Sequence, residues 1–271
     1  MIGIEVYKLF RRPRTWLTIA LLDALPTVVA ILLAATHLGP RPGTGPAFLS
    51  AVLSNGSLFA VAALAIVLPL FLPIAVAVIA GDAIAGEAQG GTLRYLLIRP
   101  VGRTRLLVAK LVASFAFVAV AVLVVAGTGF VVGRLLLGQQ PLSAAVTSVS
   151  GSSLTPAQIS WRVAISIGYV VLSMLSVAAI ALFLSTLTDS PLTASLGALA
   201  VLVGSSVLLT LDAAHALQPY LPTRYWLSFI DLFRDPILWR NVERGVALQL
   251  VYVAVFLAAA WANFASKDVT T

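Results

Sequence analysis

Six long runs of apolar residues are the feature that most limits how this chain can fold. Each run has roughly 20 residues or more, and a helix of that length is about 30 Å long, which matches the hydrocarbon core of a bilayer. The sequence therefore predicts an all-α polytopic membrane protein with six transmembrane helices. The runs cover Trp16–Leu38, Leu58–Ala80, Leu106–Gly133, Val163–Leu187, Leu192–Leu211 and Val246–Phe264.

Composition excludes a soluble domain. Of the 271 residues, 60% are hydrophobic and 10% are charged, with a mean hydropathy of +1.04. Soluble domains have about 25% charged residues. No single core could hide this much apolar surface from water, so lipid has to solvate most of it. The chain has no cysteine, which excludes disulfides and thiolate metal sites. His37 and His215 have no second ligand at metal spacing, so we expect no metal site.

The basic residues predict an orientation rather than a nucleic-acid partner. The formal charge is +7, and the basic residues lie beside the apolar runs, where they set topology and contact headgroups. With a cytoplasmic N-terminus, ten Lys and Arg residues lie inside and seven outside, and the inside excess surrounds the first three runs. An even number of spans then places both termini in the cytoplasm. No cleavable signal is evident, so the first run is expected to stay as a span.

Prolines and small residues suggest how the spans are shaped and packed. Pro26, Pro69 and Pro73 are expected to bend the first two spans. The motifs Gly129-x-x-x-Gly133 and Ala200-x-x-x-Gly204 allow close approach of helices, either within the chain or at a dimer seam.

Two charged residues fall inside apolar runs. Asp23 lies about two turns into the first run, where an ionised carboxylate is costly. It is either part of a substrate path or a proton-sensitive switch, or it reaches the interface or pairs with a basic group such as Arg14. Lys110 lies in the first turns of the third run, and we expect its amine to snorkel outward from the hydrocarbon.

Residues 1–14 predict an amphipathic helix on the cytoplasmic leaflet. Four apolar residues recur at one helical face: Ile2, Val6, Leu9 and Phe10. The basic residues lie away from that face or at its edge, and Pro13 ends the helix. The alternative is a simple basic flank that only sets topology.

Residues 82–105 form the expected cytoplasmic loop between the second and third spans. Gly90-Gly91 allows a sharp turn, Thr92 can cap a new helix, and Pro100 stops it. Three leucines give that helix an apolar stripe at i, i+3 and i+4: Leu93, Leu96 and Leu97. A short helix of this kind can dock in a groove on a cytoplasmic partner. The alternative is an ordinary basic inside loop.

Two outside segments also carry local signals. Thr155-Pro156 is a good N-cap and first-residue pair for opening a helix. Residues 212–245 combine aromatic and charged side chains, which suits short helices at the outer membrane interface.

The loop motif resembles the signature of ABC-2 type transporter permeases. The pattern is Glu87-x-x-Gly90-Gly91-Thr92-Leu93-x-x-Leu96-Leu97-x-x-Pro100-Val101-x-Arg103, followed by Leu106 and Lys110, and Glu5-x-x-Lys8-Leu9-x-Arg11 is similar to the family's start. The resemblance implies a coupling helix that sits in a cleft of an ATPase subunit, and re-entrant helices within 212–245. The residues that match the coupling segment are Glu87, Gly91, Thr92, Leu93, Arg94, Leu96, Leu97 and Pro100.

This resemblance implies one permease domain over residues 1–271, in the cytoplasmic (inner) membrane of a prokaryote. Two permease subunits, identical or paralogous, would pair in the bilayer and dock two copies of an ABC ATPase. No G-x-x-x-x-G-K-[ST] loop is present, so ATP and Mg are expected on the ATPase, with no cofactor and no enzymatic activity on this chain. The expected function is export of a hydrophobic or amphiphilic substrate by alternating access.

Three other interpretations remain open at this point. One is a channel or proton-coupled carrier that needs no ATPase and depends on Asp23. Another is an ABC-2 subunit that transmits ATP-driven motion to an extracytoplasmic partner handling a metal. A third is a membrane scaffold without transport.

Overall fold

The structure is a computed structural model, and it describes residues 2–36, 56–91, 103–137, 146–147 and 153–266. In these ranges six helices are long and apolar enough to cross a membrane, which confirms the predicted fold class. They are α2 (Pro13–Thr36), α5 (Phe71–Gln89), α7 (Arg103–Leu136), α8 (Pro156–Leu187), α9 (Pro191–Leu208) and α10 (Trp239–Ser266).

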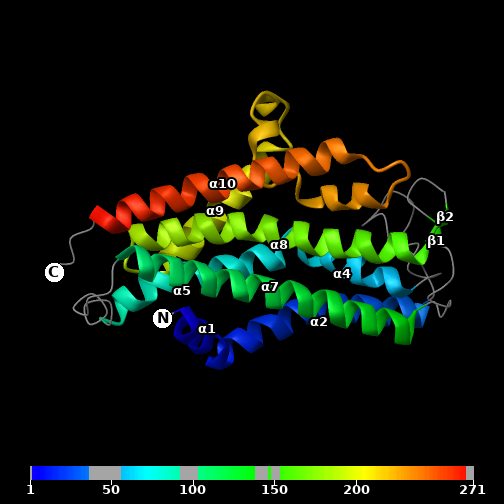
Figure 1. The fold of residues 1–271 in the computed structure, drawn as a ribbon, viewed down its shortest axis with the longest axis horizontal. Coiled ribbons are helices and arrows are strands. Elements are labelled where there is room, and N and C mark those ends of the chain that lie inside the picture. Colours follow the sequence, from blue (N-terminus) through cyan, green and yellow to red (C-terminus); the bar gives the residue numbers. More distant parts are fainter. Residues whose placement is uncertain (1, 37–55, 92–102, 138–145, 148–152, 267–271) are drawn as a thin grey trace.

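The long helices form an elongated bundle (Figure 1). Helix α1 (Ile2–Arg11) and the last turns of α10 lie at one end, called the N-terminal end below. The first and last described helices thus meet at the same end of the bundle, as an even number of spans requires. The two-residue strands β1 (Val146–Thr147) and β2 (Ser153–Leu154) pair antiparallel at the opposite end. Large apolar side chains such as Leu17, Leu21 and Leu192 are exposed on the outside of the bundle, where lipid can solvate them.

The second predicted span is a broken helix. The 3₁₀ turn η1 (Gly56–Leu58) leads into α4 (Phe59–Val67), which ends before Pro69, and α5 then begins at Phe71. Proline lacks an N–H and clashes with the preceding turn, so the predicted distortion at Pro69 is confirmed. Helix α5 runs past the predicted end at Ala80 to Gln89. Residues 82–89, predicted to be loop, are therefore helical.

Helix α8 is the central helix of the bundle and packs against α5, α7, α9 and α10. Its start is fixed as the sequence predicts, with Pro156 in the first turn. The Thr155 hydroxyl accepts a hydrogen bond from the Gln158 backbone N–H at 3.3 Å, and the Gln158 side chain accepts one from the Thr155 N–H at 2.8 Å. This reciprocal cap satisfies two amides that the helix itself cannot.

The two small-residue motifs differ in what they contact. A Cβ at Gly129 would lie 2.9 Å from the Ala63 Cβ, and one at Gly133 would lie 2.6 Å from the Phe59 Cβ. These glycines therefore let α7 approach α4 and η1 within the chain. Gly204 on α9 has no atom within 4 Å of the position its Cβ would take.

Short 3₁₀ helices precede α10, as predicted for residues 212–245: η2 (Asp212–Ala214), η3 (Gln218–Tyr220) and η4 (Trp226–Phe233). The part with η2 and η3 projects from the side of the bundle (Figure 1). Side chains of the spanning helices donate hydrogen bonds to backbone carbonyls of this segment. The Gln249 amide donates to the Pro222 oxygen at 2.9 Å, and the Tyr169 hydroxyl donates to the Tyr225 oxygen at 2.5 Å. These donors satisfy backbone carbonyls of the segment that would otherwise need water.

Candidate functional site

Seven charged side chains surround a cavity of about 930 Å³ at the N-terminal end of the bundle. They come from α1, the α1–α2 junction, α2, α5 and α7, which are separate in sequence. We call this group the ionic cluster: Glu5, Lys8, Arg12, Arg14, Asp82, Glu87 and Lys110.

Lys110 lies at the centre of the buried part of the ionic cluster. Its Nζ is 2.7 Å from the Glu5 Oε2 and also forms an ion pair with the Glu87 Oε1. The side chains of Lys110 and Glu5 are only 8% and 7% exposed. The predicted outward snorkelling of Lys110 is therefore wrong. Two carboxylates satisfy the ammonium inside the bundle, and a buried charge is tolerated when it is paired and hydrogen-bonded.

Glu5 joins α1 to the spans. It is buried on the side of α1 where Leu9 packs against the core, and its carboxylate also accepts a hydrogen bond from Lys8 at 3.2 Å. Burial acts to raise its pKa, but Lys110 and Lys8 together outweigh burial and hold the pKa below the ordinary value of 4.5. Glu5 is therefore ionised at neutral pH and binds α1 to α7 through Lys110.

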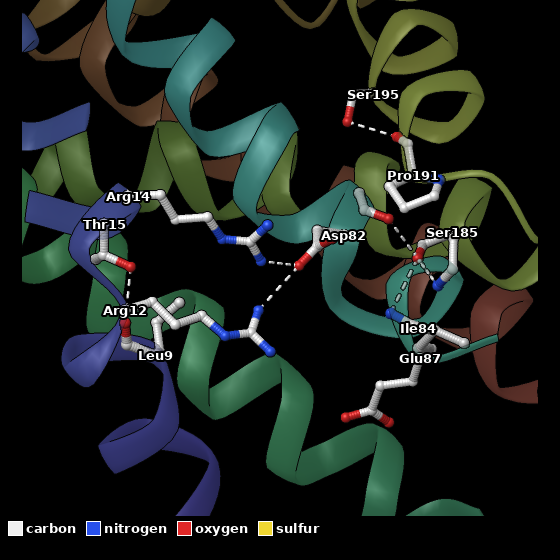
Figure 2. A network of polar contacts seen from close by, with 12 residues as sticks. Leu9, Arg12, Arg14, Thr15, Asp82, Ile84, Glu87, Ser185, Pro191 and Ser195 are labelled. Atoms are coloured by element: carbon white, nitrogen blue, oxygen red, sulfur yellow. Dashed lines mark hydrogen bonds and ion pairs between the residues drawn. The ribbon is translucent and has the colours of Figure 1, made fainter. Parts of the chain in front are cut away.

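Asp82 on α5 faces two arginines from the other side of the cavity. Its Oδ2 accepts from Arg12 at 3.1 Å and from Arg14, which converge on it in Figure 2. The corner between α1 and α2 that carries these arginines is fixed by the buried Thr15 hydroxyl, which donates to the Leu9 oxygen at 2.7 Å. The cluster therefore ties the start of the first span to the end of α5.

Ser185 of α8 holds the last turns of α5. Its hydroxyl donates to the Gly81 oxygen at 2.7 Å and accepts from the N–H groups of Ile84 and Ala85 at 3.1 and 2.8 Å (Figure 2). A hydroxyl has one donor hydrogen and two acceptor lone pairs, so these three hydrogen bonds use the full capacity of the Ser185 hydroxyl. The end of α5 thus has a fixed position relative to α8.

Asp23 is bonded away from the ionic cluster. The Thr128 hydroxyl of α7 donates to its Oδ1, whereas Arg14, the basic partner considered from the sequence, pairs with Asp82. Asp23 does not line the described cavity. Its contact joins the first and third spans, and a role in a substrate path stays a prediction.

The residues predicted to couple to an ATPase are only partly described. Glu87 lies in the last turns of α5, within the ionic cluster. Gly91 follows with a φ of +66°, a conformation that suits glycine, so the predicted sharp turn is confirmed. The other predicted coupling residues lie outside the described residues: Thr92, Leu93, Arg94, Leu96, Leu97 and Pro100.

The sequence analysis missed several residues of this site. A signal existed for Glu5, because it lies three residues after Ile2 and four before Leu9, on the apolar face of α1. No sequence signal singles out Ser185 or the pairing of Asp82 with Arg12. In the part of the chain that the structure describes, no group of three or more His, Cys, Asp or Glu side chains could hold a metal ion.

Comparison with known proteins agrees with these observations. The profile of the "ABC-2 family transporter protein" family matches residues 1–203. This range contains the whole ionic cluster and all of the predicted coupling residues, and it ends within α9. A search of curated proteins found no match. The match covers three quarters of a chain with six candidate spans, and the chain therefore belongs to the ABC-2 family of transporter proteins.

Proposed function

We propose that this chain is the permease subunit of an ATP-driven exporter whose ATPase is a separate protein. Family membership and the six spans support a transport role. The sequence contains no phosphate-binding loop, so ATP would bind to the partner together with Mg. The observation that carries the proposal is the ion pair of Glu87 with Lys110, because these residues flank the loop where family members are expected to meet the ATPase.

The geometry around that loop is suited to passing a displacement into the bundle. Residues 90–102 join the end of α5 to the start of α7, and the Glu87–Lys110 pair ties these two helices together close to that connection. Glu5 extends the connection to α1, and Ser185 extends it to α8. A push on residues 92–99 would therefore move several helices together. ATP-driven closure of two ATPase subunits would switch the spans between inward-open and outward-open packings.

The proposed assembly has two permease subunits, identical or paralogous, and two ATPase subunits in the inner membrane of a prokaryote, with both permease termini cytoplasmic. The proposed substrate is hydrophobic or amphiphilic, because few charged side chains lie along the described spans away from their ends. A carrier that works without an ATPase would instead depend on Asp23. That residue is bonded to Thr128 and does not line the described cavity.

Co-purification with the ATPase encoded by a neighbouring gene tests this proposal. The double variant Leu96→Asp/Leu97→Asp should lose the ATPase, because two carboxylates replace the apolar stripe of the docking helix. The matched control is Leu96→Met/Leu97→Met, which keeps the stripe apolar and should keep the ATPase. Equal recovery of ATPase with both variants would show that the stripe is not the docking element. Failure of the unmodified chain to bind any ATPase would favour the carrier.

A further inference from the structure

Apart from Lys110, the cations of the ionic cluster are more exposed than its carboxylates. The acidic side chains are largely buried, and the buried Lys110 neutralises part of their charge. The other three cations lie at the cavity mouth with about half of each side chain exposed: Lys8 47%, Arg12 48% and Arg14 50%. Counting the seven groups, four cations and three anions leave one excess positive charge. The accessible part of the cavity is therefore cationic.

Arg12 and Arg14 also keep unused donor capacity. Each guanidinium has five N–H donors in a planar fork, yet both arginines share a single oxygen, the Oδ2 of Asp82. Figure 2 shows the two side chains converging on that carboxylate from the same side. Two guanidinium groups beside one carboxylate can accept a second anion, and phosphate matches their fork geometry.

The cavity lies where a phosphate attached to acyl chains can reach it. Arg14 is the second residue of the first span, at the depth where headgroups meet water. Trp16, an interfacial residue type, lies two residues further along and is exposed. Leu17 and Leu21 follow on one exposed face of α2, at i and i+4, with 61% and 64% of their surface open. A cationic cavity mouth above an exposed apolar face is complementary to an anionic amphiphile.

We propose that this cavity binds the phosphate of an anionic phospholipid from the leaflet at the N-terminal end. Lys8, Arg12 and Arg14 hold the phosphate, and Leu17 and Leu21 contact an acyl chain. Asp82 competes with the lipid for the two arginines and so sets the affinity. A soluble phosphate would use the same cations without the apolar face. An ammonium headgroup would need a carboxylate partner, and Asp82 and Glu5 already form ion pairs with Arg12 and Lys110.

Native mass spectrometry of the detergent-solubilised full chain tests this site. Phosphatidylglycerol and phosphatidylcholine with the same acyl chains are titrated, and we expect the anionic lipid to bind about tenfold more tightly. Arg12→Gln/Arg14→Gln should abolish that preference. The control Arg11→Gln/Arg105→Gln removes two exposed charges at the same end of the bundle that do not line the cavity, and it should keep the preference.

The Asp82→Asn variant should change the affinity for phosphatidylglycerol in the opposite direction to the arginine variant. Removing the competing carboxylate should strengthen phosphatidylglycerol binding several-fold, whereas a purely structural role for the cluster predicts weaker binding in this variant too. This measurement stands alone if the double arginine variant does not fold. The proposal is overturned if Asp82→Asn binds the lipid no more tightly, if the two lipids bind equally, or if equimolar inorganic phosphate displaces phosphatidylglycerol.

Discussion

The carboxylates of the buried Glu5 and the part-buried Glu87 both depend on Lys110. Its replacement in Lys110→Met leaves Glu5 and Glu87 without their shared cation, and breaking a buried ion pair in this way costs about 3 kcal/mol or more. The matched change Lys8→Met removes a half-exposed lysine that also contacts Glu5, and it should cost less than about 1 kcal/mol. Thermal unfolding of both variants in the same detergent measures the difference. Equal losses would show that Lys110 has no special role.

Glu5 should make stability depend on pH on the acid side. Its pKa in the folded chain is below the ordinary value of 4.5, so the folded state binds this proton more weakly than the unfolded chain does. The resulting stabilisation is fully present above 4.5 and is lost as the pH falls through the lower folded pKa. The difference in melting temperature between the unmodified chain and Glu5→Gln should therefore shrink below about pH 4.5. A difference that stays constant down to pH 3 would contradict this account.

Single residues were the least predictable part of the site. The place of Glu5 on an apolar helix face was readable, because helical spacing alone gives it. The partner of Asp23 could not be predicted from the sequence, because Thr128 is 105 positions away and its hydroxyl resembles many others in the spans. Lys110 was predicted to reach water, since nothing local shows that two carboxylates converge on it. Pairing across the bundle depends on tertiary packing that a local pattern does not contain.

At the scale of helices, α7 depends on two glycines where it meets α4 and η1. Gly133→Ala should destabilise the chain by about 1–3 kcal/mol, because the added methyl overlaps the backbone of η1 and the Phe59 Cβ. Gly127→Ala is the control in the same helix. Its Cβ would meet open space, and replacing glycine in a helix interior stabilises by up to about 1 kcal/mol. Unfolding measurements that rank the two variants in the reverse order would refute this packing.

Hydropathy largely predicts the positions of the spanning helices in the sequence. All six predicted runs overlap a spanning helix, because bilayer thickness fixes the length of apolar run required. The end of α5 could not be predicted from the sequence, because residues 82–89 contain charged and small residues typical of a loop. They stay helical because α8 and α9 hold this stretch: Ser185 bonds its backbone, and a Cβ at Gly81 would lie 2.6 Å from the Ser195 hydroxyl. Tertiary contacts here outweigh local composition.

At the scale of the whole molecule, the ionic cluster and Ser185 connect α1, α2, α5, α7 and α8 at one end of the bundle. Residues 90–102 connect α5 to α7, and both of these helices belong to this group. A force applied to this group therefore has several paths into the spans. Separate contacts of Gln249 and Tyr169 hold the segment before α10. This arrangement supports the proposal that ATP-driven movement reaches the whole bundle through one loop.

The distance between the two helix ends that flank this loop tests the proposal most directly. The chain has no cysteine, so spin labels can be placed at the exposed positions Gln89→Cys and Arg105→Cys without background. In the complex with the ATPase, ATP should shift the distance distribution between the labels, and Leu96→Asp/Leu97→Asp should abolish the shift. Identical distributions with and without ATP, in a complex that hydrolyses ATP, would contradict transmission through this loop.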